Sequence, residues 1–505
     1  MACLLYPAGS MPAEGSLPPL TVEDLQLERM AESMSPSHYY RVSPQELNAL
    51  LSSDLEVLRH RQAVMAELLE QPALEGAMER LLGAIDGWES RSGGIRRGLD
   101  SFAVGLNLED FSWLENCLQK LGNACRDFEA LELRSAGLRA LAQQLREIRC
   151  SAQFQSVEAD FRLLCAGHVS PAKMRLGYNL DKSLKPSRLK LLQMEAYAGD
   201  LEKGKGKKQA APEKRRLTLT QRALEMDSML LQKAVSAASQ SIAGFVMRIT
   251  GPLRSLKKEL IFYLAGLKLC RSWSAMGLPH CFPELKPMEE RAFEAESLFS
   301  PLLVAGGREK VVCNDVRFAP GGELIILTGA NQGGKTVFLL SVGLAQWLAQ
   351  LGLMVPAARA TVSPADNILT VFAPNSSQRS SRGLLAEEAG RIAAAVGLVS
   401  GCSLVLFNEP LTSTGPEETR AISGEVLAVF KAAGVRGLWV THVYELAAKR
   451  RQLEEAIPWG SAMGSLRILL QETEAGSEST YKVLRGEPEF DSHAYDALRR
   501  GGVEL

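Results

Sequence analysis

The residues best suited to chemistry form a glycine-rich run at 329–336, Gly-Ala-Asn-Gln-Gly-Gly-Lys-Thr. The run fits the P-loop pattern G-x-x-x-x-G-K-[ST]; the apolar residues 324–327 lead into it and a helical pattern follows, as a strand–loop–helix unit requires. Backbone N–H groups of such a loop surround nucleotide phosphates, the lysine reaches the β and γ phosphates, and the hydroxyl binds Mg²⁺. We therefore predict that ATP or GTP, with Mg²⁺, is bound by Gly329, Asn331, Gly333, Gly334, Lys335 and Thr336.

Two later strand-like runs also end in residues suited to phosphate chemistry. The apolar run 403–407 leads into Asn408 and Glu409, the position of a Walker B acid, and we predict that Glu409 is the general base that orients or deprotonates the attacking water. Asn408 stands where Mg²⁺ sites usually have an aspartate; its amide can accept a hydrogen bond from a metal-bound water but adds no charge, which predicts slow turnover. The run 437–441 delivers His442, predicted to sense the γ phosphate or to position water.

Composition bounds the class of protein. At 505 residues the chain is too long for one core, and its net charge of -1 provides no global field that would recruit nucleic acid or membrane. The nine cysteines are scattered without a C-x-x-C pair, which is typical of reduced thiols in a cytosolic protein. Glycine and serine interrupt the best apolar stretch, and the start has no basic segment, so we expect neither a membrane span nor a signal peptide. We predict a soluble, cytoplasmic protein.

Residue patterning divides the chain into a flexible lead-in and several folded parts. Residues 1–42 are rich in Pro, Gly, Ser and Met and are expected to be mobile. Helical periodicity dominates residues 43–169 and returns in 225–275. In 276–505, short β-like runs alternate with helices, as an α/β sheet requires. The predicted fold class is multidomain, with an α-helical region followed by an α/β P-loop domain.

Residues 170–224 concentrate positive charge, with fourteen basic and five acidic side chains. The glycine-spaced centre is expected to be flexible enough to follow a phosphate backbone, and a short hairpin is expected at 177–192. The residues predicted to bind nucleic acid are Lys203, Lys205, Lys207, Lys208, Arg215 and Arg216. The alternative is a solvated loop that lysines keep soluble.

Taken together, these motifs resemble the ATPase domain of the MutS family of DNA mismatch repair proteins, a branch of the ABC-type ATPases. Residues 328–336 are similar to the family's T-G-P-N-M-G-G-K-S, residues 403–409 to its S-L-V-L-x-D-E, and residues 441–446 to its T-H-x-x-E-L. Val-Pro-Ala at 355–357 follows at the usual distance, and Tyr481 with Gly486 matches the Y-x-x-x-x-G ending.

The resemblance implies roles for further parts of the chain. In this family a helical core and lever helices precede the ATPase and carry an inserted DNA-gripping clamp, so 43–169 and 225–275 correspond to core and levers and 170–224 to a clamp-like insertion. Two ATPase domains pair head to tail and each lends a serine to the other's nucleotide, which implies a homodimer with Ser380 acting in trans. Asn314 belongs to a segment that resembles the adenine-side loop without its leading aromatic residue.

The sequence also departs from the family pattern. The 42 residues before Ser43 are shorter than a typical domain, so the mismatch-reading and connector domains are not expected there. Asn408 replaces the family's aspartate, the loop 410–414 is shorter than its Gly-Arg-Gly-containing counterpart, and no nuclease-like domain is expected after the ATPase.

These observations lead to one main hypothesis and several alternatives. The main hypothesis is a dimeric, ATP-switched clamp that binds duplex or branched DNA without itself reading a mismatch. A second hypothesis replaces DNA with RNA or a ribonucleoprotein, because phosphate contacts carry no sequence information. A third is a near-inactive structural ATP binder, motivated by Asn408 and the short loop. A metabolic kinase is least favoured, since nothing in the helical half indicates a small-substrate pocket.

Overall fold

The computed structural model describes most of the chain. The described backbone comprises residues 4–10, 15–100, 108–152, 154–155, 171–180, 186–196, 252–330, 332–373, 383–473 and 476–488. Side chains are described throughout these ranges except in 90–100, 108–115, 171–180, 186–196, 472–473 and 476–478. Within the described part of the chain, no helix is long and apolar enough to span a bilayer.

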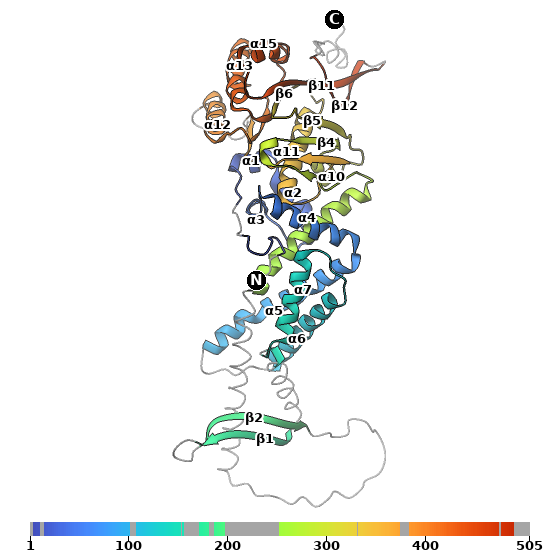
Figure 1. The fold of residues 1–505 in the computed structure, drawn as a ribbon, viewed down its shortest axis with the longest axis vertical. Coiled ribbons are helices and arrows are strands. Elements are labelled where there is room, and N and C mark those ends of the chain that lie inside the picture. Colours follow the sequence, from blue (N-terminus) through green and yellow to red (C-terminus); the bar gives the residue numbers. More distant parts are fainter. Residues whose placement is uncertain are drawn as a thin grey trace, which may run out of the picture. The chain divides into compact units, whose positions relative to one another are not determined.

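The chain divides into two compact units, of which the first is formed by residues 71–134 and 138–260 together with the first two residues. Its helices are α5 (Pro72–Asp100), α6 (Leu108–Glu129), most of α7 (Ala136–Cys150) and the first part of a helix at 252–275 (Figure 1). Buried residues at helical spacing, among them Leu74, Met78 and Leu81, form the packed face of α5. Lys257 bonds both Asp86, at 2.6 Å, and Glu89, at 2.9 Å.

The same unit contains an antiparallel pair, β1 (Pro171–Leu180) and β2 (Pro186–Ala196). The hairpin expected at 177–192 is therefore confirmed, although its strands are longer than the prediction. The lysine- and arginine-rich residues 197–224 that follow lie outside the described residues.

The second unit, residues 3–70, 135–137 and 261–505, contains a six-stranded sheet in the order β12-β11-β6-β10-β9-β8. Its strands are β6 (Glu323–Thr328), β8 (Ile368–Phe372), β9 (Leu404–Asn408), β10 (Arg436–Val440), β11 (Ala462–Thr473) and β12 (Gly476–Arg485). All neighbours are parallel except β11 and β12. Every residue of β6 and β10 is buried, as expected for central parallel strands covered by helices on both faces.

Helices and a smaller sheet complete this unit (Figure 1). The helices after β6 are α11 (Lys335–Leu351), α12 (Leu384–Leu398), α13 (Pro416–Ala433), α14 (Tyr444–Ala448) and α15 (Arg450–Ala456). The second sheet has the order β3-β7-β4-β5 and is formed by β3 (Glu284–Leu285), β4 (Phe293–Leu298), β5 (Asn314–Arg317) and β7 (Arg359–Val362). Two short elements, η1 (Met288–Glu290) and α10 (Pro301–Ala305), flank β4. The predicted combination of a helical region and an α/β domain is confirmed.

The N-terminal segment is part of the second unit, and the expectation of a mobile lead-in is wrong for its described residues. It forms α1 (Pro19–Asp24) and α2 (Leu27–Met34), followed by α3 (Pro44–Asn48) and α4 (Leu55–Glu70). Leu27, Met30 and Met34 are fully buried at helical spacing. The Pro- and Ser-rich composition concealed this apolar face, because helices of six and eight residues are too short to produce a strong periodic signal.

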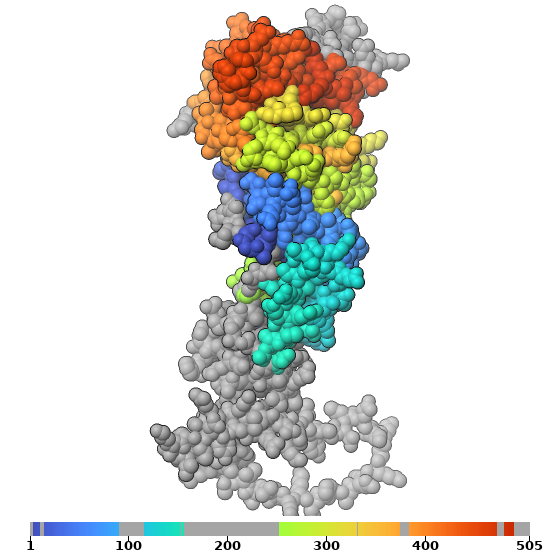
Figure 2. Space-filling model, in the orientation of Figure 1, coloured from blue at the N-terminus to red at the C-terminus, as the bar shows by residue number. Residues whose placement is uncertain are grey.

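The N-terminal helices pack on the large sheet and on α11. Thr21 Oγ1 donates a hydrogen bond of 3.0 Å to the carbonyl oxygen of Ile368 in β8. A Cβ at Gly343 of α11 would stand only 2.7 Å from Leu25 Cδ2, so Leu25 lies directly against that helix. In the space-filling view, blue N-terminal residues border the yellow-green and orange residues of the α/β part of the same unit (Figure 2).

Leu25→Ala is expected to lower the free energy of unfolding of this unit by about 2–5 kcal/mol, because it leaves a cavity beside α11. Urea denaturation followed by tryptophan fluorescence measures the change. The control is Glu28→Ala, an exposed position on α2 where the effect should stay within about 0.5 kcal/mol. Unfolding of Leu25→Ala at the wild-type midpoint would show that the N-terminal segment does not stabilise the sheet.

Candidate functional site

The parallel strands β6, β10 and β9 bring the residues predicted to bind and hydrolyse the nucleotide to one edge of the sheet. Val440, the last residue of β10, is paired with Leu327 of β6 on one side and with Asn408 of β9 on the other. The Glu409 amide donates to the Val440 carbonyl at 2.9 Å, so the chain leaves β9 close to β10. The P-loop, Glu409 and His442 therefore emerge side by side, as the carboxyl ends of neighbouring parallel strands must.

The P-loop has the backbone that its glycines were predicted to provide. Gly329 has a φ of +151° and a Cβ there would stand 2.7 Å from Ile468, while Gly334 has a φ of +91° just before α11. Both positions disfavour any residue with a side chain. Gly333 lines the same loop, and its amide donates to the Ala330 carbonyl at 3.2 Å.

Lys335 is folded back over this loop. Its Nζ donates to the carbonyl oxygens of Gly329, at 2.9 Å, and Ala330, at 3.0 Å, and lies 3.7 Å from Glu409 Oε1. Only 4% of its side chain is exposed. Burial lowers the pKa of Lys335, and the carboxylate of Glu409 only partly offsets this effect. A phosphate in the loop would add negative charge beside the buried ammonium group.

The two predicted Mg²⁺ ligands are in contact. Thr336 Oγ1 donates to Asn408 Oδ1 at 3.0 Å. A hydroxyl and an amide oxygen are the hard, neutral ligands that Mg²⁺ accepts when phosphate oxygens provide the charge. These residues therefore fit a Mg²⁺–nucleotide complex better than a free cation, since the neighbouring carboxylate of Glu409 has other partners.

Glu409 is paired with His442. Its Oε1 lies 2.7 Å from His442 Nε2. This hydrogen bond is the main cause that holds the pKa of Glu409 below its ordinary value; the charges of His442 and Lys335 act in the same direction, and burial opposes them. Glu409 is therefore ionised at neutral pH, as a general base must be.

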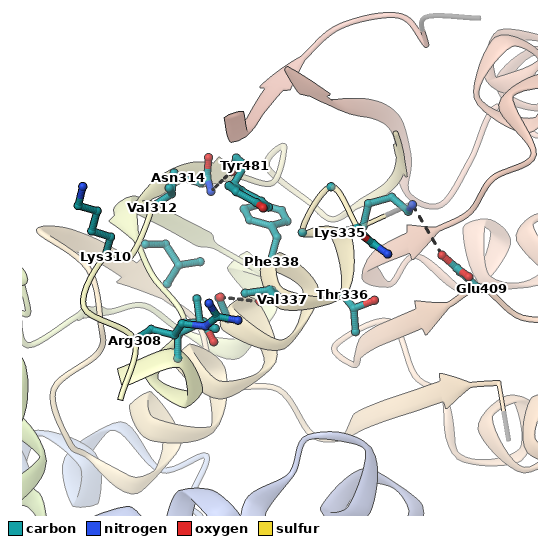
Figure 3. A pocket seen from close by; sticks show the side chains of 17 residues that line it. Arg308, Lys310, Val312, Asn314, Lys335, Thr336, Val337, Phe338, Glu409 and Tyr481 are labelled. Atoms are coloured by element: carbon teal, nitrogen blue, oxygen red, sulfur yellow. Dashed lines mark hydrogen bonds and ion pairs between the residues drawn. The ribbon is translucent and has the colours of Figure 1, made fainter. Parts of the chain in front are cut away.

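A cavity of about 450 Å³ extends from these residues along α11 to the β4 and β5 ends (Figure 3). Lys335, Thr336 and Glu409 line one end of it, and Arg308 and Lys310 line another part. A volume of this size is typical of small-ligand sites.

Tyr481 on β12 also lines this cavity, a role that sequence reasoning missed. Its ring lies against the P-loop, since a Cβ at Gly334 would be 3.2 Å from Tyr481 Cδ1. Tyr481 has a φ of +58°, next to a register irregularity between β11 and β12. The only sequence signal was its place in the family's ending motif, which says nothing of where the ring points.

Asn314, which was predicted to bind the nucleotide, lies in the cavity wall, and its side-chain amide is bonded to the protein. Nδ2 donates to the Tyr481 carbonyl at 3.0 Å, and Oδ1 accepts from the Val483 amide at 2.8 Å. Both ends of the side-chain amide thus hold the irregular part of β12. Asn314 therefore supports the wall that contains Tyr481, and a direct contact with the base would require breaking these bonds.

Several predicted site residues lie outside the described residues. These are Asn331, Ser380, Lys203, Lys205, Lys207, Lys208, Arg215 and Arg216. Their roles stay predictions. The structure brings together Gly329, Gly333, Gly334, Lys335, Thr336, Asn408, Glu409 and His442, with Asn314 on the cavity wall.

Two protein-family models match the chain. MutS domain V matches residues 325–487, and the MutS2 N-terminal domain matches residues 53–276. Curated relatives named Endonuclease MutS2 include those of Geobacillus kaustophilus, 33% identical over 201 residues, Listeria monocytogenes serotype 4b, 31% over 204, and Pediococcus pentosaceus, 28% over 198. The matches cover 39–40% of this chain and 24% of each relative, so the chain spans about a quarter of their length.

The match to MutS domain V, an ATPase domain, covers the P-loop, Glu409, His442 and Tyr481. The second match covers most of the helical region that precedes it. The order of the two matches is also the order that the motifs predicted. From the site's geometry and these matches we conclude that the chain belongs to the MutS family.

Proposed function

We propose that the protein is an ATP-dependent DNA-binding protein of the MutS type, a dimer switched by ATP binding and hydrolysis. The observation that carries this proposal is the convergence of Lys335, Thr336 and Glu409 at one end of a single cavity, with His442 bonded to Glu409. The endonuclease activity in the relatives' name is not part of the proposal, because the matches cover 24% of those proteins.

ATP binding is supported by the shape and charge of the cavity. The triphosphate would lie in the P-loop, where Lys335 exchanges its carbonyl acceptors for phosphate oxygens. The adenine would extend toward Tyr481, and Arg308 and Lys310 add positive charge along the cavity. The side chains of Arg308 and Lys310 are exposed, so both can approach a polyanion. Within the described part of the chain, this approach would break no ion pair.

Hydrolysis is supported by the state of Glu409. An ionised carboxylate held by His442 can accept a proton from water while its position stays fixed. Thr336 and Asn408 would hold Mg²⁺, which neutralises charge on the phosphates. Because Asn408 brings no charge, we propose that turnover is slow.

Dimer formation and DNA binding rest on the family and on charge. Ser380 from a second copy would complete the nucleotide site in the closed dimer, so that ATP favours closure through differential affinity for the two states. The basic residues 170–224 would grip duplex or branched DNA. We further propose that this chain does not read mismatches itself, since its two matches are to the MutS2 N-terminal domain and the ATPase domain.

Tyr481→Ala is expected to weaken ATP binding about tenfold, because base stacking on an aromatic ring contributes roughly 1–3 kcal/mol. Asn314→Ala should weaken it similarly through Tyr481, and the double variant should be little worse than either one. Titration calorimetry measures the affinities. The control is Asn367→Ala, a half-buried residue whose side-chain amide donates to the Leu398 carbonyl and which does not line the cavity. If Tyr481→Ala bound ATP with unchanged affinity, the Tyr481 ring would not contribute to ATP binding.

Glu409→Ala is expected to lower kcat for ATP about 10²–10⁴-fold and to leave ATP affinity within about threefold, because the base acts only in the chemical step. His442→Ala removes the hydrogen bond that lowers the pKa of Glu409, so that pKa should rise and the acidic limb of kcat should move to higher pH. Steady-state kinetics across pH measures both effects. Wild-type turnover in Glu409→Ala would exclude this residue as the base.

DNA binding is expected to be salt-sensitive and to change between ADP and ATP. Replacing Lys203, Lys205, Lys207 and Lys208 with Ala should reduce the slope of log K against log salt by about 0.9 for each lost phosphate contact. Fluorescence anisotropy on homoduplex, mismatched and branched DNA and on structured RNA measures this. A variant lacking Lys120, Arg126, Arg139 and Arg146, all exposed, controls for total charge. Preference for RNA would favour the ribonucleoprotein hypothesis, and no binding at all would contradict the clamp.

A further inference from the structure

Helix α12 carries a buried carboxylate that the proposed hydrolysis does not use directly. Glu388 is 2% exposed. Its Oε1 accepts two hydrogen bonds of 3.0 Å from Thr412, one from the amide and one from the hydroxyl, and its Oε2 accepts one from the Ser413 hydroxyl. A carboxylate is an acceptor without donors, so it can accept from all three groups at once.

The residues that Glu388 binds belong to the turn directly after Glu409. Glu409 has a φ of +51° and Leu411 a φ of +64°, so two non-glycine residues flank Pro410 in the left-handed region. This conformation is unfavourable for residues with a Cβ and persists only where surrounding contacts hold it. The turn is also the segment that is shorter than its family counterpart, which leaves it fewer residues over which to relax.

Contacts on the other side of the turn are local. Thr419 Oγ1 donates to the Leu411 carbonyl at 3.0 Å and lies 2.7 Å from Thr414 Oγ1. These groups belong to the turn and to the first turn of α13, which follows it directly. Glu388 is therefore the hydrogen-bonding anchor that comes from a different, distant segment of the described chain.

Helix α12 is itself firmly held, which makes it a suitable anchor. Arg391, one helical turn after Glu388, is 8% exposed and donates to the Phe372 carbonyl at the end of β8, at 3.3 Å. It also lies 3.5 Å from Asp24 Oδ1 of α1. Glu388 thus connects the catalytic turn to a helix tied to both the sheet edge and the N-terminal segment.

We propose that Glu388 is a positioning residue: by holding Thr412 and Ser413 it keeps the turn in the shape that leaves Glu409 beside His442 and Lys335. The inference rests on the proposed function, since positioning matters for catalysis only if Glu409 assists ATP hydrolysis. Removing the anchor lets the turn relax and moves Glu409 away from its partners while the nucleotide cavity stays intact.

The test compares Glu388→Ala, Glu388→Gln and Glu409→Ala, alone and combined. Glu388→Ala should lower kcat about 10–100-fold and leave ATP affinity within about threefold, because only the chemical step loses its base. Glu388→Gln should keep most of the activity, because its amide oxygen can accept from Thr412 and its NH₂ can donate to the Ser413 hydroxyl. In the Glu409→Ala background, Glu388→Ala should cause no further loss. The control Glu425→Ala, which removes an exposed carboxylate of α13 that does not line the cavity, should stay near wild type.

Hydrogen exchange gives a readout that does not depend on hydrolysis. In Glu388→Ala, amide exchange should accelerate in residues 411–415 and stay unchanged in β6 and α11. Three results would each overturn the inference. They are a wild-type kcat in Glu388→Ala, an equal loss of kcat when Glu388→Ala is added to Glu409→Ala, and unchanged amide exchange in residues 411–415. Failure of the proposed function gives a different result: the wild-type protein would then show no ATP turnover that depends on Glu409. In that case the hydrogen-exchange result alone decides whether Glu388 holds the turn.

Discussion

The parallel pairing of β10 with both β6 and β9 is the constraint on which the site depends. Val440 is in register with Leu327 and Asn408 at once, so the P-loop, Glu409 and His442 leave the sheet at the same level. One residue of slip in either pairing would carry Glu409 away from Lys335 and His442. The buried, apolar character of these strands fixes that register, because a shifted strand would expose or misplace its side chains.

At this edge of the sheet, the polar side chains bond one another or the backbone of the P-loop. Lys335 bonds the loop that is proposed to hold phosphate, Asn408 and Thr336 bond each other, and Glu409 and His442 form a pair. The two carbonyl contacts of Lys335 satisfy an ammonium group that would otherwise be buried without hydrogen-bond partners, whereas Glu409 and His442 are half-buried. We propose that nucleotide binding exchanges the carbonyl acceptors of Lys335 for phosphate oxygens. The site is preorganised in this sense, and the pKa directions of Lys335 and Glu409 follow from the same contacts.

Elements outside the motifs hold the site from two sides. Asn314 fixes the irregular part of β12 and with it Tyr481, while Glu388 on α12 fixes the turn after Glu409. The N-terminal helix α1 lies against β8 and reaches Arg391 on α12. A segment whose composition indicates mobility is thus built into the support of the ATPase fold.

The sequence by itself determined the family, the P-loop, Glu409, His442 and the alternation of strands and helices, because these signals lie in contiguous residues whose spacing reflects local geometry. Only the tertiary structure decided how residues 15–42 pack and where the Tyr481 ring lies. It also decided the hydrogen bonds of the Asn314 side chain and those that Glu388 accepts from Thr412 and Ser413. Each of these depends on contacts between segments that are distant along the chain. Such contacts leave no periodic signal in one sequence, since many residue types can fill them once the sheet has brought the segments together.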